Sequence, residues 1–264
     1  TIYDFENLHV VNEIDIPAKR MNVVINESSV VMTADEQFLL VFNMNPGTSV
    51  TVINLDSETV VGEIPMPGCT LMYPDTQRGF FSLCGNGGLV HLMLDEQGGE
   101  KSRWSSEVFN DIDADPLSEK AAYINGVWYL VSYKGEVQPI DVTAQRPAVA
   151  ERWWLASEMD RAANWRPAGW HGKAGNATDG NTKLWVAMTP DGYDGSHKDP
   201  ATEVWLMDVE RRSMLKRISL EVPALSIDVN RANDLLVVNI DGNLDVYNGL
   251  TGEYRHNIRA LGDT

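Results

Sequence analysis

The chain has 264 residues and a formal net charge of −17, and 43% of its residues are hydrophobic. This composition is typical of a globular protein with a sizeable core and excludes an intrinsically disordered chain. The acidic excess, which no Lys/Arg cluster offsets, argues against nucleic acid and anionic membranes as partners, and no apolar run approaches the ~20 residues of a membrane helix.

Short apolar runs rich in Val, Ile, Trp and Tyr follow one another along the chain, bounded by Gly, Asn, Asp and Pro. Their length and their flanking residues predict strands rather than helices, and hence an all-β fold. The runs are Phe38–Phe42, Val50–Leu55, Val127–Val131, Leu184–Met188, Val204–Met207 and Leu235–Val238. One helix is predicted, from Ala156 to Ala163, with Ser157–Asp160 as its capped first turn.

An imperfect repeat indicates a β-propeller. In each copy an apolar strand ends in Asp or Asn, and in the polar turn that follows this side chain can accept hydrogen bonds from backbone amides two residues on. The copies end at Asp4, Asp56, Asp95, Asp141, Asp208 and Asn248, so the gaps are 52, 39, 46, 67 and 40 residues. This spacing is typical of propeller blades of about 40–50 residues with one long insertion.

We expect residues 1–264 to form a single β-propeller domain with five full blades and a leading two-strand hairpin. Near the C-terminal end, Ser213–Leu220 is predicted as a fourth strand, and Leu225–Val229, Asp234–Ile240 and Leu244–Tyr247 as the first three strands of the next blade. Because a closed propeller normally pairs its two chain ends, the half blade at the start predicts that N-terminal blades are absent from this sequence.

The two cysteines, Cys69 and Cys84, flank a predicted hairpin. If residues 70–73 and 79–83 are neighbouring antiparallel strands, the two sulfurs meet at one end of that hairpin. A disulfide there would contribute about 3 kcal/mol of stability and would indicate an exported protein. Two buried free thiols are the alternative.

The sequence contains no recognisable catalytic set. It lacks the P-loop, nucleophile-elbow and C-x-x-C motifs, and its five His are not spaced as a metal pair. Asp111, Asp113 and Asp115 resemble the start of a calcium loop, but Pro116 stands where that loop needs Gly, so an acidic surface turn is the better interpretation. We therefore assign no catalytic, cofactor-binding or metal-binding residue to this chain.

Two segments are candidates for a subunit interface. Trp165, Arg166 and Trp170 follow the predicted helix, either as core anchors with Arg166 stacked on an aromatic ring or as a contact surface, since Trp and Arg are frequent hot-spot residues. His197 and Lys198 lie in a long polar loop that is either functional or merely mobile.

These residues also carry a resemblance to a known family. Ala162–Trp170 resembles the stretch ADGWRPGGW, Cys69–Cys84 a hairpin of pattern C…FP…FF…C, and Ser196–Trp205 an HK…A loop with the strand after it. In this order along the whole chain, they resemble the heavy subunit of amine dehydrogenases that use tryptophan tryptophylquinone. Ile16–Arg20 and Phe42–Pro46 look closer to the aromatic amine branch of that family than to the methylamine branch.

The resemblance implies a seven-bladed propeller with a Cys69–Cys84 disulfide, in a periplasmic α₂β₂ enzyme that oxidises primary, aromatic amines to aldehyde and ammonia. It places tryptophan tryptophylquinone and the catalytic base on a small light subunit, and it implies that electrons pass to a blue copper protein or a cytochrome. This chain would then be a scaffold that binds no cofactor itself.

Two other functions fit the same residues. A propeller that serves only as a protein-interaction scaffold would equally lack a catalytic set. A propeller enzyme with its own cofactor, such as a pyrroloquinoline quinone dehydrogenase, would usually need a calcium site, for which Asp111–Asp115 is a poor candidate. The discriminating feature is the partner, because an amine dehydrogenase heavy subunit co-purifies with a small coloured chain.

Overall fold

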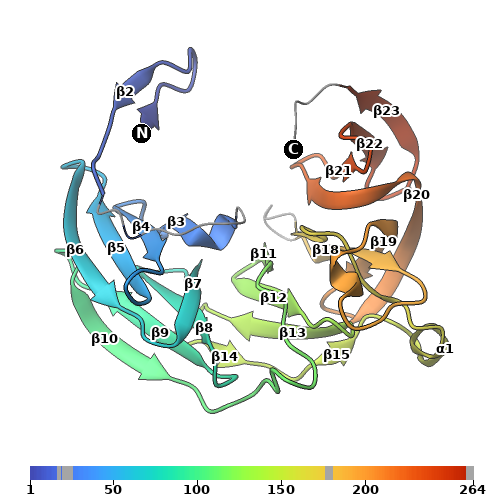
Figure 1. The fold of residues 1–264 in the computed structure, drawn as a ribbon, viewed down its shortest axis with the longest axis horizontal. Coiled ribbons are helices and arrows are strands. Elements are labelled where there is room, and N and C mark those ends of the chain that lie inside the picture. Colours follow the sequence, from blue (N-terminus) through green and yellow to red (C-terminus); the bar gives the residue numbers. More distant parts are fainter. Residues whose placement is uncertain (17–18, 20–25, 176–180, 260–264) are drawn as a thin grey trace. The chain divides into compact units, whose positions relative to one another are not determined.

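The computed structural model describes residues 1–16, 19, 26–175 and 181–259, and its regular secondary structure is almost entirely β-strand (Figure 1). The predicted all-β class is confirmed. The chain forms two compact units, one of Thr1–Ile112 with Thr143–Pro147 and the other of Asp113–Val142 with Ala148–Thr264. Of the stretch Ile16–Arg20, Pro17, Ala18 and Arg20 lie outside the described residues.

Within its described residues, the first unit contains one two-stranded and two four-stranded antiparallel sheets. Its elements are β1 (Ile2–Tyr3), β2 (Val10–Asn12), η1 (Glu27–Ser29), β3 (Val30–Met32), β4 (Phe38–Asn43), β5 (Ser49–Asn54), β6 (Thr59–Pro65), β7 (Cys69–Pro74), β8 (Gly79–Cys84), β9 (Leu89–Leu94) and β10 (Glu100–Ser105). The strands β3 to β6 and β7 to β10 pair in chain order. Each four-stranded sheet is therefore a meander, as in a propeller blade.

The inner strands of the first unit are buried on both faces. Nearly every residue of β4, β5, β8 and β9 is buried, whereas β6 and β10 are mostly exposed. Phe38, Leu40, Val50, Phe80 and Leu92 belong to one apolar cluster, and each is 0% exposed. This double burial explains why the sequence shows continuous apolar runs there instead of an alternating pattern.

The predicted disulfide is present in the first unit. Cys69 and Cys84 are register partners at the end of the β7–β8 hairpin, and their sulfurs are bonded. At the other end of the hairpin, Tyr73 stacks on Phe81 with 4.8 Å between ring centroids. The hairpin is thus fixed at one end by a covalent bond and at the other by aromatic packing.

The second unit contains a five-stranded and an eight-stranded antiparallel sheet in its described residues. Its elements are β11 (Ala122–Ile124), β12 (Val127–Val131), β13 (Glu136–Asp141), β14 (Ala148–Val149), β15 (Trp153–Trp154), α1 (Glu158–Ala162), β16 (Arg166–Pro167), β17 (Lys173–Gly175), β18 (Lys183–Thr189), η2 (Ser196–Lys198), β19 (Ala201–Asp208), β20 (Ser213–Val229), β21 (Asp234–Asn239), β22 (Leu244–Asn248) and β23 (Tyr254–Ile258). Two core clusters fill it, one with Trp205 and one with Trp185.

The prediction of separate strands at Ser213–Leu220 and Leu225–Val229 is wrong, because both lie in the single 17-residue strand β20. Its first part pairs with β19 and its second part with β21, so one strand serves two successive four-stranded groups. The physical reason is the linking sequence Glu221–Ala224, which contains no Gly, Asn or Asp to reverse the chain.

The predicted helix is confirmed, although it is shorter than expected. It spans Glu158–Ala162, and the side chain of Ser157 accepts a hydrogen bond from the amide of Asp160 at its start. Glu158 and Asp160 lie in the first turn, where negative charge favours the helix.

The turn chemistry expected for the repeat is present in both units. Asp4, Asp95, Asp208 and Asn248 each accept a hydrogen bond from the backbone amide two residues on. In the second copy Asn54 has the equivalent role, bonding the amide of Ser57. These short-range bonds fix the turns after β1, β5, β9, β19 and β22. Of these, β5, β9, β19 and β22 are each the third strand of a four-stranded group.

None of the helices in the described part of the chain is long and apolar enough to span a membrane. The same residues contain no group of three or more His, Cys, Asp or Glu side chains that could bind a metal ion. In the acidic turn, Asp115 accepts a hydrogen bond from the amide of Lys134 at 2.9 Å.

Candidate functional site

A glycine-containing loop after β16 positions Trp170. Gly169 has a φ of +75°, and its amide donates to the carbonyl of Asp199 at 2.8 Å, which joins this loop to the one that carries η2. A Cβ on Gly172 would lie 2.1 Å from the carbonyl oxygen of Ala168, so the loop folds back on itself only with glycine there. These contacts bring Trp170 beside the residues of η2.

The polar loop of residues 190–200 is ordered by local hydrogen bonds. The hydroxyl of Ser196, which is 1% exposed, accepts from the amide of Tyr193, and the amide of Asp199 donates to the carbonyl of Ser196. The result is the 3-10 turn η2, which holds His197 and Lys198. The His197 ring stacks on Tyr133, with centroids 3.8 Å apart and planes 9° apart.

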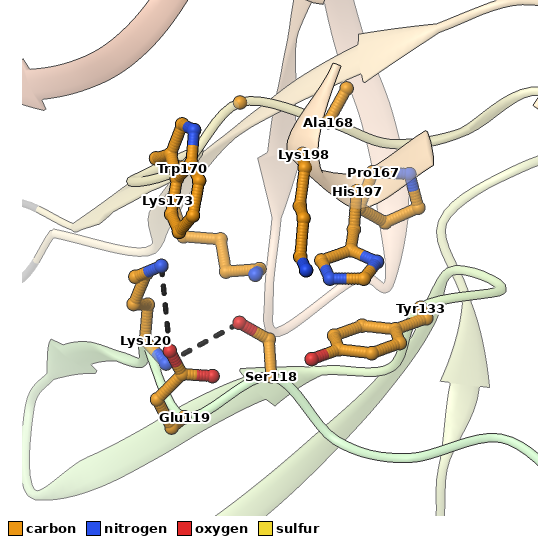
Figure 2. A pocket seen from close by; sticks show the side chains of 11 residues that line it. Ser118, Glu119, Lys120, Tyr133, Pro167, Ala168, Trp170, Lys173, His197 and Lys198 are labelled. Atoms are coloured by element: carbon orange, nitrogen blue, oxygen red, sulfur yellow. Dashed lines mark hydrogen bonds and ion pairs between the residues drawn. The ribbon is translucent and has the colours of Figure 1, made fainter. Parts of the chain in front are cut away.

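These loops enclose a pocket within the second unit (Figure 2). Its volume is about 110 Å³. It is lined by Ser118, Glu119, Lys120, Tyr133, Pro167, Ala168, Gly169, Trp170, Lys173, His197 and Lys198. One wall comes from the segment before β11 and the turn after β12, and the other from the loop before β17 and from η2. We refer to it as the lysine pocket.

Three lysines contribute charge to the lysine pocket. The Nζ atoms of Lys120 and Lys198 lie 5.2 and 6.0 Å from the centroid of the Trp170 ring, within the range of cation–π contacts. Lys120 Nζ also pairs with Glu119 at 3.4 Å. Figure 2 shows the ammonium of Lys173 pointing into the same space. Three ammonium groups therefore face one carboxylate.

The lysine pocket shifts the pKa values of its own groups. The pKa of Lys173 is lowered to about 7, mainly because burial penalises the charged ammonium; Glu119 opposes the shift and Lys120 adds repulsion. Burial and the charges of Lys198 and Lys173 lower the pKa of His197. Burial acts to raise the pKa of Glu119, but a backbone hydrogen bond and the nearby lysines lower it overall.

Of the five residues that the sequence predicted for an interface, the structure brings three together: Trp170, His197 and Lys198. Trp165 lies elsewhere, packed against the core with its ring 5.3 Å from that of Trp205. Arg166 pairs with Asp194 at 2.9 Å.

The cation that stacks on Trp165 is Arg217, whereas the sequence interpretation had Arg166 stacked on Trp165 or Trp170. The guanidinium of Arg217 lies 5.4 Å from the Trp165 centroid and 4.2 Å from the Trp205 centroid. Trp165 is thus packed as a core anchor, as one of the two sequence interpretations held for Trp165 and Trp170, but its cation is Arg217 and not Arg166, and Trp170 is 41% exposed.

Sequence reasoning missed Ser118, Glu119, Lys120, Tyr133 and Lys173. The first three form an ordinary polar stretch, and Lys173 is a single lysine after a glycine. No sequence pattern near these residues predicts a site. They line the lysine pocket because the pairing of distant strands brings their segments together. The glycines around Trp170 were the one available signal of close backbone packing.

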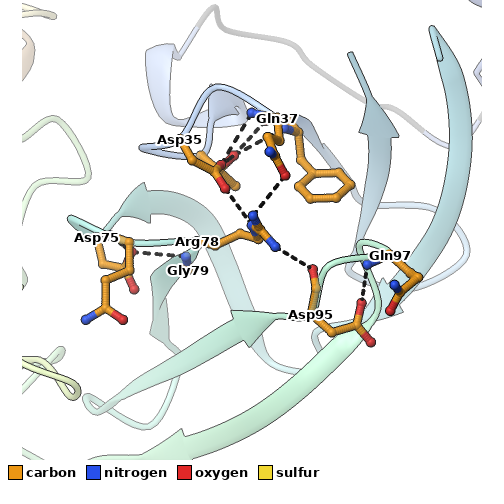
Figure 3. A network of polar contacts seen from close by, with 10 residues as sticks. Asp35, Gln37, Asp75, Arg78, Gly79, Asp95 and Gln97 are labelled. Atoms are coloured by element: carbon orange, nitrogen blue, oxygen red, sulfur yellow. Dashed lines mark hydrogen bonds and ion pairs between the residues drawn. The ribbon is translucent and has the colours of Figure 1, made fainter. Parts of the chain in front are cut away.

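A second polar cluster, in the first unit, contrasts with the lysine pocket (Figure 3). Arg78 donates from Nε to Asp35 at 2.6 Å, from Nη2 to Gln37 at 2.8 Å and from Nη1 to the carbonyl of Asp95 at 3.4 Å, and its guanidinium lies 5.7 Å from the Phe38 centroid. Burial acts to raise the pKa of Asp35, but hydrogen bonds, including that from Arg78, lower it overall.

Beside this cluster lies a buried pair. Nε2 of His91 is 2.9 Å from Oδ2 of Asp75, and the two side chains are each 3% exposed. Oδ1 of Asp75 accepts from the amides of Gln77 and Gly79 at 2.7 and 3.0 Å. Both oxygens of the Asp75 carboxylate therefore have hydrogen-bond partners, one in the imidazole and the other in the turn, as is typical of a buried structural group.

The fold resembles solved β-propeller structures. The chain superimposes on the β-propeller domain of Cps50 (Swd1) from Myceliophteria thermophila with a TM-score of 0.54 and 11% identity, covering 89% of this chain and 71% of that one. BamB from Moraxella catarrhalis gives a TM-score of 0.50 and 10% identity, covering 86% and 60%. The protein thus has the fold of a β-propeller.

The sequence comparisons define the family. A model described as methylamine dehydrogenase heavy chain matches residues 1–264. The methylamine dehydrogenase heavy chains of Methylobacillus flagellatus and Paracoccus versutus are 25% and 24% identical to the chain, each over 99% of its length. The chain spans 66% and 61% of the length of these two relatives. The chain belongs to the methylamine dehydrogenase heavy chain family.

Proposed function

We propose that this chain is the heavy, non-cofactor subunit of a quinoprotein amine dehydrogenase, an oxidoreductase that converts primary amines to aldehyde and ammonia. The observation that carries the proposal is the family match, which is continuous over residues 1–264. We also propose that these residues belong to one β-propeller domain, as the series of four-stranded groups supports.

The finer assignments rest on the family resemblance. We propose a periplasmic α₂β₂ assembly whose light subunit carries tryptophan tryptophylquinone, which supplies the two-electron oxidising chemistry, and a blue copper protein or cytochrome as acceptor. The Cys69–Cys84 disulfide supports an oxidising compartment. The likeness of Ile16–Arg20 and Phe42–Pro46 to the aromatic amine branch supports aromatic amines as substrates.

We propose that the rim of the lysine pocket contributes to the light-subunit interface. Trp170 is 41% exposed and Lys198 is exposed, so both are available to a partner, and His197 is held beside them by η2. Arg166 and Trp165 stay in the proposed interface as positioning residues. Arg166 tethers the loop of η2 through Asp194, and Trp165 anchors the segment before Trp170 in the core.

An absorbance spectrum of the protein purified from its source tests the enzyme assignment. We expect a small second chain on the gel and a visible quinone band that bleaches when a primary amine is added. Comparison of an aromatic amine with methylamine tests the substrate class, with the aromatic amine expected to bleach the band at lower concentration. A colourless single chain would contradict the assignment and would favour a propeller scaffold.

Co-purification with the light subunit tests the interface. Alanine at Trp170 or Lys198 should weaken light-subunit retention, because Trp is a frequent hot-spot residue and the second change removes a cation from the proposed contact surface. Lys216→Ala is the matched control, since Lys216 is an exposed lysine of β20 that does not line the pocket. Retention unchanged in both pocket variants would remove these residues from the interface.

A further inference from the structure

The lysine pocket carries more positive charge than its own residues neutralise. Lys120 pairs with Glu119, whereas Lys173 and Lys198 form no ion pair within the described part of the chain. Such a local excess stands out in a chain of net charge −17. Because like charges in a partly desolvated site repel, an anion that entered would be attracted by two ammonium groups and would relieve their repulsion.

The size of this excess indicates a monoanion. Lys120 and Glu119 offset each other, Lys198 contributes one positive charge, and Lys173 contributes between none and one near neutral pH. Glu119 would repel the second charge of a dianion such as phosphate. A ligand with a single negative charge therefore matches the site better.

The walls of the lysine pocket indicate that the ligand also has an apolar part. Trp170, Pro167 and Ala168 supply apolar surface on one side, and the Tyr133 ring, stacked on His197, supplies it on another. In Figure 2 the hydroxyl of Ser118 points toward the ammonium of Lys173, and Nδ1 of His197 is buried without a hydrogen-bond partner in the described residues. Polar groups are thus available to fix the orientation of a carboxylate.

The volume sets an upper limit on that apolar part. The pocket measures about 110 Å³, and a cavity of about 150 Å³ can hold benzene. A carboxylate with a short chain fits inside, and an aromatic ring fits if it extends toward the mouth of the pocket. We propose that the lysine pocket is a binding site for a small organic monocarboxylate, held by Lys198 and Lys173 and packed against Trp170.

Isothermal titration of the whole chain with benzoate tests the proposal. Benzyl alcohol, which has similar size but no charge, and inorganic phosphate, which has charge but no apolar part, are the matched comparisons. We expect a Kd for benzoate of about 1 mM or below, with both comparison ligands at least about tenfold weaker. Equal affinities for benzoate and benzyl alcohol, or no heat with benzoate, would overturn the proposal.

Variants locate the site. Lys198→Gln should weaken benzoate binding about tenfold, whereas Lys216→Gln should leave it unchanged. Circular dichroism establishes that both variants are folded, and the ligand comparison on the unmodified chain stands even if a variant does not fold. Equal weakening in the two variants would place the ligand elsewhere and overturn the assignment.

A final experiment, on the complex with the light subunit, distinguishes a free carboxylate from an acidic side chain of the partner. Among the tests of this site, only this experiment rests on the proposed function. If the purified complex with the light subunit still binds benzoate, the ligand is a free small molecule, as proposed. If the complex no longer binds benzoate although the heavy chain alone does, the partner occupies the pocket and the proposal of a free ligand fails. Neither outcome depends on amine oxidation, so a failed enzyme assignment remains distinguishable.

Discussion

The Arg78 cluster of the first unit and the lysine pocket of the second unit hold similar side chains with different charge balance. Arg78 donates three hydrogen bonds, to Asp35, to Gln37 and to the Asp95 carbonyl. In the lysine pocket, Lys173 and Lys198 line a cavity and share its single carboxylate, Glu119, with Lys120. The first arrangement holds strands and turns together, and the second leaves charge available to a ligand.

The comparison shows how a polar cluster can be assigned a role from its charge balance. Where each donor meets an acceptor of the same chain, removing one partner leaves a buried group unsatisfied, and the protein loses stability. Where cations of the same chain crowd together, removing one relieves repulsion and desolvation. Mutations in the two clusters should therefore change stability in opposite directions.

The largest effect is expected in the first unit at the buried Asp75–His91 pair. Asp75→Ala leaves His91 and the amides of Gln77 and Gly79 without an acceptor, so we expect a loss of about 3 kcal/mol in the free energy of unfolding. Guanidinium unfolding measures it. Asp75→Asn keeps an acceptor and should lose less; a loss below about 1 kcal/mol for the alanine variant would contradict a structural role.

Arg78→Gln should have the next largest effect, a loss of about 1.5 kcal/mol, because it removes charge-assisted hydrogen bonds from a partly buried group. Arg211→Gln is the matched control. The side chain of Arg211 is 78% exposed and pairs with Asp208 at 3.5 Å, and such an exposed pair contributes less than about 1 kcal/mol. Equal losses, measured by urea unfolding, would mean that Arg78 is no more important than an ordinary surface pair.

Lys173→Met should stabilise the second unit by about 1 kcal/mol at pH 6, because the native state then no longer holds a desolvated ammonium. The pKa of Lys173 is lowered from 10.5 to about 7 on folding, so the unfolded chain binds more protons between these values and the wild type gains stability as pH rises. The advantage of the variant should therefore shrink from pH 7 toward pH 10.5. A destabilised variant at pH 6 would show that Lys173 is structural.

The smallest effect concerns the pH dependence of carboxylate binding. Of the groups around Lys173, Glu119 has a lowered pKa, which favours its charged form, and His171 and His197 have lowered pKa values, which favour their neutral forms. Lys120, Lys198 and Tyr133 also face the pocket.

Between pH 6 and 8 the charge of Lys173 changes, because its pKa of about 7 lies inside this range. Because the protonated ammonium attracts the anion, benzoate affinity should fall about threefold over this range, by titration calorimetry at constant ionic strength. In Lys173→Met the affinity should not vary with pH. An affinity that rises with pH would exclude Lys173 from the site.

Much of the fold was accessible from the sequence because its signals are local. The Asp and Asn turns, the capped helix and the Cys69–Cys84 hairpin each depend on residues a few positions apart, or on one hairpin. The two strands predicted at Ser213–Leu220 and Leu225–Val229 form one strand, because no Gly, Asn or Asp stands between them to reverse the chain.

The lysine pocket was only partly accessible. Trp170 stood out because it lies in a short segment with Trp165 and Arg166 after the helix, and His197 and Lys198 because they lie in a long polar loop. Lys120 and Lys173 lie 53 positions apart, and their convergence depends on how the strands of the second unit pair. Neither segment contains a local signal that the other lies beside it. The cavity and the lowered pKa of Lys173 are therefore visible only in the folded chain.

The uninterrupted strand β20 has a consequence for how the second unit opens. Its 17 residues pair with β19 along one part and with β21 along the other, so the two four-stranded groups share a single hydrogen-bonded backbone. Separating either group would disturb the strand that the other requires. The amides of β19 and β21 should therefore exchange with solvent deuterium through a common opening event, as one cooperative unit rather than as two independent blades.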